Sequence, residues 1–105
     1  MELNEAFALA LKELRGRAKR SQFDFAPTVS REYISLLERA QRWPSLEKID
    51  EISSVLGIHA LSLVAKCYLH KNPDIPLSEL LRIISEDLQD QSLESSKNSS
   101  PKGTS

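Results

Sequence analysis

Apolar side chains recur along this chain at the three- and four-residue spacing of amphipathic helices. The first such stripe lies between residues 4 and 18 and consists of Phe7, Ala10, Leu11, Leu14 and Ala18. Basic residues collect toward the end of this segment, where cations are favourable at a helix C-terminus. Glycine and aromatic residues are sparse and alternating strand patterns are absent, so the chain is predicted to be all-α.

A second, very short helix is predicted to follow Ser21, whose hydroxyl can cap a helix N-terminus. Phe23, Phe25 and Ala26 are expected to give it apolar contacts. Pro27 disfavours helical geometry at the residue before it, so the helix ends there or is distorted.

The third predicted helix covers residues 30–40, with Ser30 as its N-cap. Ile34 and Leu37 lie three residues apart on one face, and Val29 leads into the helix. Its polar residues fall mostly outside that face: Arg31, Glu32, Ser35 and Arg39.

Two further helices follow. Ser45 is expected to cap a helix whose core stripe is Leu46, Ile49, Ile52, Ser53 and Leu56, with Gly57 at its C-terminal end. The next helix, over residues 60–69, is apolar nearly all round. It should therefore be buried on more than one side, by its own core or by a second subunit.

A break at residues 71–76 precedes a sixth helix over residues 77–90, with one stripe made of Leu77, Leu80, Leu81, Ile84 and Leu88. We expect this helix to pack back on the domain or to lie against a partner's copy. Residues 92–105 are rich in serine and almost free of apolar side chains, so we expect a disordered tail. The predicted organisation is a domain at 1–70, a linker and amphipathic helix at 71–91, and the tail at 92–105.

Charge is unevenly distributed, although the whole chain carries a net charge of only −1. Residues 12–42 hold eight basic and four acidic side chains, for a net charge of +4, whereas residues 43–105 hold six basic and nine acidic ones. A basic front half favours a polyanionic partner at one end of the molecule. Chance clustering on an ordinary solvated surface is the alternative.

Other chemistry is not indicated. The single cysteine, Cys67, cannot form an internal disulfide, which suits a reducing cytoplasm, and we expect it to be buried. Cys67, His59 and His70 fall short of the four ligands of a usual structural zinc site, so no metal or other cofactor is predicted. No phosphate loop, paired carboxylates or nucleophile–base pair is present, and we expect neither an enzyme nor a membrane span or signal peptide.

Several separate motifs occur in an order that resembles the Cro/C1-type (Xre) helix-turn-helix family, which includes phage repressors and restriction–modification controllers. They are the segments Leu11–Arg15, Ser21–Ala26, Val29–Arg39, Trp43–Glu47 and Leu56–Ile58. The resemblance implies a five-helix, lambda-repressor-like domain, here followed by the sixth helix and the tail. Two departures are that Pro27–Thr28 replace a longer turn and that Ala40 stands where the family usually has glycine.

The resemblance also implies residue roles. The third helix would lie in the DNA major groove, where Arg31, Glu32, Tyr33 and Ser35 are the expected base contacts. The alternatives are an exposed arginine, an acid favoured by the helix N-terminus, and a packed tyrosine. Phosphate contacts are expected from Gln22, Thr28, Ser30, Arg39, Gln41 and Arg42, with Gln22 also able to brace the third helix. Arg15 and Glu38 match a structural ion pair.

We therefore expect a DNA-binding transcriptional regulator of the repressor type that binds a partly palindromic double-stranded operator as a homodimer. The two copies are expected to pair through the fifth and sixth helices. Its expected location is the bacterial cytoplasm, at the nucleoid when bound. The alternative is a protein-interaction module, such as an antitoxin or an accessory subunit that retains the fold and acts through a protein partner.

Overall fold

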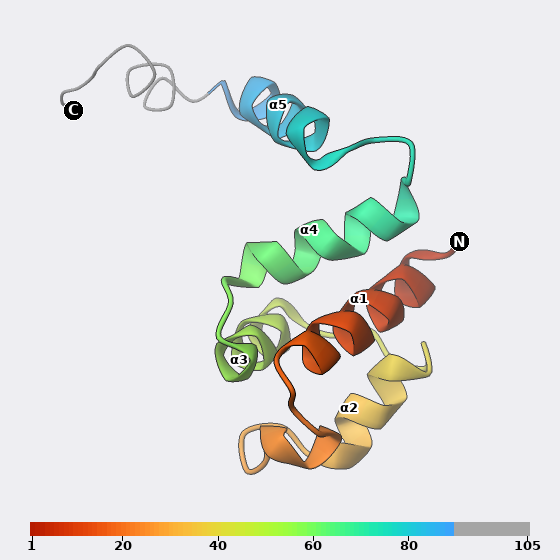
Figure 1. Ribbon diagram of the computed structural model, residues 1–105, viewed down its shortest axis with the longest axis vertical. Helices are drawn as coiled ribbons and strands as arrows, with labels where there is room; N and C mark the ends of the chain where they lie inside the picture. The colour runs from red at the N-terminus through yellow and green to blue at the C-terminus, as the bar shows by residue number, and fades with distance from the viewer. Residues whose placement is uncertain (90–105) are drawn as a thin grey trace, which may run out of the picture. The chain divides into compact units, whose positions relative to one another are not determined.

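The computed structural model describes residues 1–89, and within them the chain forms five α-helices and one 3-10 helix, with no β-strand (Figure 1). This agrees with the all-α prediction. The helices belong to two units, residues 1–74 and the segment that begins at Ile75, and each is described by itself. The predicted tail at 92–105 and the predicted end of the last helix at residue 90 lie outside the described residues.

Helix α1 (Leu3–Arg17) is central to the first unit. It packs against α4 (Ala60–Lys71) and against α2 (Arg31–Glu38), and Figure 1 shows it running between them. The predicted stripe is buried as expected, with Phe7, Ala10 and Leu11 in the core and the remaining two residues packed against it.

The predicted second helix is a 3-10 helix, η1 (Gln22–Phe25). Its start is held by Asp24, whose carboxylate accepts a 2.7 Å hydrogen bond from the backbone N–H of Ser21. Ala26 is extended before Pro27, so the helix ends where the sequence predicted. The peptide bond between these two residues is cis. Of the three residues expected to give apolar contacts, Phe25 is fully buried, whereas Phe23 is 69% exposed and Ala26 is exposed as well, so that expectation is wrong for Phe23 and Ala26.

Helix α2 begins at the predicted cap, because Ser30 Oγ accepts a 3.1 Å hydrogen bond from the backbone N–H of Tyr33. Its inner face is formed by Ile34 and Leu37, which are fully buried. After the helix, Ala40 adopts a left-handed conformation with φ +60°. The Gln41 N–H then reaches back 2.9 Å to the carbonyl of Leu36, which closes the helix end.

Helix α3 (Leu46–Leu56) is capped by Ser45, whose Oγ accepts a 3.1 Å hydrogen bond from the Lys48 N–H. It ends at Gly57, which has the left-handed φ of +74° that favours glycine there. Ile52, Ser53 and Leu56 are buried. Leu46 is 81% exposed, so its assignment to the core stripe is wrong: it lies in the first turn, beyond the edge of the core.

Helix α4 is only partly buried. Leu63 and Cys67 are in the core, whereas Leu61 and Tyr68 are exposed. Within the first unit α1 and α3 pack on α4, and Leu61 and Tyr68 stay exposed, so the core of this unit does not cover the whole apolar circumference of the helix. The alternative, burial by a second subunit, stays a prediction.

Helix α5 (Leu77–Leu88) lies in the second unit. Arg82 forms ion pairs with Glu79 and, at 2.6 Å, with Glu86 on its polar side. Large apolar side chains are exposed along the helix: Leu77, Leu81, Ile84 and Leu88.

Candidate nucleic-acid interface

The predicted base contacts all lie on α2, the helix that corresponds to the third predicted one. Glu32 is exposed, and Arg31, Tyr33 and Ser35 are half-buried. The opposite side of the same helix is fixed in the core by Ile34. The arrangement therefore presents a short row of polar side chains from the first two turns of a helix that cannot rotate without exposing its core face.

Two arginines near this row stack on aromatic rings. The guanidinium carbon of Arg31 lies 5.1 Å from the centre of the Phe23 ring, and that of Arg42 lies 5.4 Å from the Tyr33 ring. Both distances are within the range of cation–π attraction. Tyr33 packs partly against the core, so it serves as a support for Arg42 as well as a candidate contact.

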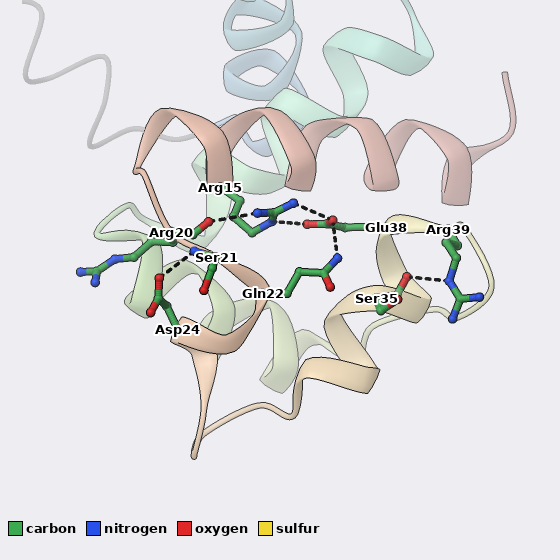
Figure 2. Close-up of polar contacts among 8 residues, drawn as sticks. All are labelled: Arg15, Arg20, Ser21, Gln22, Asp24, Ser35, Glu38 and Arg39. Atoms are coloured by element: carbon green, nitrogen blue, oxygen red, sulfur yellow. Dashed lines mark hydrogen bonds and ion pairs between the residues drawn. The ribbon is translucent and has the colours of Figure 1, made fainter.

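The predicted phosphate contacts surround the row. The side chains of Thr28, Gln41 and Arg42 are exposed. Ser30 is exposed too, although its hydroxyl already accepts the capping hydrogen bond of α2. Arg39 folds back on its own helix, and its Nε donates a 3.3 Å hydrogen bond to the Ser35 carbonyl (Figure 2).

An ion pair between Arg15 and Glu38 ties α1 to α2 (Figure 2). Arg15 Nε donates to Glu38 Oε2 at 2.6 Å, and a second nitrogen donates to Oε1 at 3.0 Å. The Glu38 side chain is only 5% exposed, and that of Arg15 is 23% exposed. Hydrogen bonding to Glu38 raises the pKa of Arg15, so the guanidinium stays charged.

Two neighbouring segments join this pair. Gln22 Nε2 donates to Glu38 Oε1 at 3.0 Å, and Arg15 also donates to the carbonyl of Arg20 at 3.0 Å (Figure 2). Gln22 thus braces α2 from η1, and its expected phosphate contact stays a prediction. We call Arg15, Gln22 and Glu38 the brace; it fixes α1, η1 and α2 relative to one another.

Sequence reasoning did not include Phe23 or Trp43 among the site residues. Phe23 supports Arg31, and Trp43, 61% exposed, directly follows Arg42 in the loop between α2 and α3. The available signal was the position of each aromatic residue beside a predicted contact. The pairing of Phe23 with Arg31 depends on how η1 and α2 meet, which the spacing in sequence does not reveal.

Other kinds of site find little support in residues 1–89. Within that range, no three His, Cys, Asp or Glu side chains are grouped so as to hold a metal ion. Cys67 is buried, and burial raises the pKa of its thiol, which keeps it protonated. No single helix there is long and apolar enough to cross a membrane; α3 and α4 pass such a test only as a pair bent by 102°.

Comparison with known proteins places this interface in context. Residues 11–63, slightly more than half of the chain, match a family model described as helix-turn-helix. No curated protein and no solved structure matches the chain. The matched segment runs from α1 into α4, and it includes the brace and every predicted DNA contact.

Proposed function

The chain belongs to the Cro/C1-type helix-turn-helix family of DNA-binding regulators, and on this premise we propose that it is a sequence-specific transcriptional repressor that binds a palindromic operator as a homodimer. One observation carries the proposal: in the first turn of α2, Arg31 and Glu32 lie outside the buried face of the helix. The brace holds that buried face against α1. We assign α2 to the major groove.

In this proposal Arg31 is the leading base contact, because a guanidinium can donate two parallel hydrogen bonds to O6 and N7 of guanine. Glu32 accepts from a cytosine amino group, and Tyr33 and Ser35 are supporting contacts. Phosphates are bound by Thr28 and Ser30 before α2 and by side chains after it, namely Arg39, Gln41 and Arg42.

Two copies are needed because one helix of eight residues contacts too few base pairs for useful specificity. Two recognition helices set about 34–36 Å apart would reach successive turns of the major groove. Exposed apolar side chains on α4 and α5, including Leu61, Tyr68 and Leu81, support a dimer formed through these helices. A cytoplasmic location is part of the same proposal.

The test is enrichment of bound duplexes from a random pool, followed by affinity measurements at several salt concentrations. Wild type should enrich a palindrome and bind it about a thousandfold or more tighter than random DNA. No enriched motif, with only weak salt-sensitive binding, would refute the proposal.

Variants separate the roles of the two stacked arginines. Arg31→Ala should lose about 1–3 kcal/mol of discrimination at one base pair in each half-site. Arg42→Ala should weaken all sequences and reduce the salt dependence by about one unit. The matched control is Arg82→Ala, an exposed arginine that is paired with acids of its own helix. If both test variants affect specific and random DNA equally, the assigned roles are wrong.

A second candidate is a protein-interaction module, such as an antitoxin or an accessory subunit that retains the fold. The exposed apolar side chains of α5 favour it, because such a face commonly binds another protein. This candidate predicts that Arg31→Ala leaves function unchanged, whereas Leu81→Asp and Ile84→Asp abolish it. Loss of function in Arg31→Ala with partner binding intact would favour the repressor.

A further inference from the structure

Phe23 is a large apolar residue that contributes nothing to the core of the first unit. Its side chain is 69% exposed, whereas Phe25, two residues later in the same short helix, is fully buried. The phenyl ring has no polar group that could hydrogen-bond to water, so neither core packing nor hydration favours its position. The contact recorded for its ring is with the guanidinium of Arg31, across the junction of η1 and α2.

The geometry of that contact suits an arginine that must also bind a base. A ring attracts a guanidinium through its face, while the five N–H donors lie in the guanidinium plane and point outward. At 5.1 Å from the ring centre, Arg31 is held without using those donors. Within residues 1–89, no acidic side chain forms an ion pair with Arg31.

Both partners of the stack are anchored at the backbone. Arg31 directly follows the Ser30 cap, and η1 is held by the burial of Phe25 and by the hydrogen bond between Gln22 and Glu38. The ring therefore restricts the rotamers of a long side chain whose freedom would otherwise be lost on binding.

With Arg31 on a guanine, a ring stacked beside it would lie close to the edge of a neighbouring base pair. In the major groove thymine presents a 5-methyl group, and apolar side chains recognise thymine through it. Phe23 is 69% exposed and lies beside the Arg31 guanidinium, so its ring offers an apolar surface of this kind.

We propose that Phe23 is a specificity-determining residue that holds Arg31 for guanine and contacts the 5-methyl group of the adjacent thymine. The proposal rests on the proposed DNA-binding function and extends it to a residue of η1. It assigns recognition of a two-base step to a pair of residues from two different helices.

The experiment uses the full chain and the duplex that wild type enriches from the random pool. The guanine position is the one at which Arg31→Ala loses discrimination. At this position guanine is replaced by 7-deazaguanine, which lacks the N7 acceptor, and each neighbouring thymine is replaced in turn by uracil, which lacks the methyl group. Affinities of wild type, Phe23→Ala, Phe23→Leu and Phe23→Tyr are measured on all duplexes.

Wild type should prefer thymine to uracil at one neighbouring position by about fourfold, the value of one buried methyl group. Phe23→Ala should lose this preference and should reduce the guanine preference by about two- to fivefold. Phe23→Leu should retain the thymine preference but not the full guanine preference, because it is apolar without a ring face. Phe23→Tyr should retain both.

Circular dichroism checks that the variants fold, and substitution at so exposed a position should leave the helix content unchanged. Trp43→Ala is the matched control, since it removes another exposed aromatic residue that does not stack on Arg31. A thymine preference in Phe23→Ala equal to that of wild type, or an undiminished guanine preference, overturns the proposal while the DNA-binding function stands. Failure of wild type to enrich any sequence overturns both.

Discussion

Removing the guanidinium of Arg15 should destabilise the protein far more than the loss of an ordinary surface ion pair. Glu38 is 5% exposed at its side chain and accepts two of its three hydrogen bonds from Arg15, the third coming from Gln22. Arg15→Met keeps the aliphatic stem but leaves the carboxylate buried with one partner. Stranding a buried charge in this way costs about 3–5 kcal/mol.

The same figure follows from the individual contacts. Each hydrogen bond to a charged group contributes about 1.5–3 kcal/mol, and two are lost. Since a small domain is stable by about 5–15 kcal/mol in total, Arg15→Met should remove a large part of it. Glu38→Leu should cost less, because Arg15 is more exposed and keeps the carbonyl of Arg20 as a partner.

Urea unfolding followed by far-ultraviolet circular dichroism measures these changes. The double variant Arg15→Met/Glu38→Leu buries no charge, so it should be more stable than Arg15→Met, with a coupling free energy of at least about 1 kcal/mol. Lys48→Met is the control, since it removes a half-exposed ion pair with Glu51 and should cost no more than about 1 kcal/mol. A loss below about 1 kcal/mol for Arg15→Met, or additive single changes, would refute the reasoning.

Three further predictions concern stability. Ala40→Gly should raise the melting temperature by about 2–4 °C, because glycine avoids the cost of a left-handed alanine. Ala26→Gly, at an extended φ, should lower the melting temperature, and a change in the same direction for both variants would contradict this. Ser53→Ala should stabilise the protein by about 1 kcal/mol in urea unfolding, because it removes a buried hydroxyl with no hydrogen-bond partner within residues 1–89. A hydrogen bond with His70 lowers the pKa of Glu13 below its ordinary 4.5. The ionised Glu13 carboxylate therefore stabilises the folded protein fully above pH 4.5, and this contribution is lost as the pH falls through the lowered pKa. Glu13→Gln should therefore flatten the acid side of the stability profile, and parallel profiles would contradict the contact.

Features determined by a few adjacent residues were predictable from the sequence. Ser30 and Ser45 cap helices, Pro27 ends η1, and Gly57 takes a left-handed conformation, each as expected. These features depend on short-range hydrogen bonds and backbone sterics, which a sequence window contains.

Features that depend on packing between helices were not predictable to the same degree. Leu46 fits the period of its helix and yet lies beyond the core, and α4 is apolar around most of its circumference although Leu61 and Tyr68 are exposed. Periodicity gives the face of a helix but not the extent of its neighbours. For the candidate site, the resemblance supplied the residues of α2, while the support of Arg31 by Phe23 required the three-dimensional arrangement.

The exposed position of Trp43 has a consequence for how this protein is followed in solution. It is the only tryptophan of the chain, and it is already 61% exposed while the protein is folded. Its fluorescence should therefore change little when the helices melt. DNA bound at the loop after α2 would instead shield or quench the indole. Tryptophan emission should therefore change when DNA binds but change little when the protein unfolds.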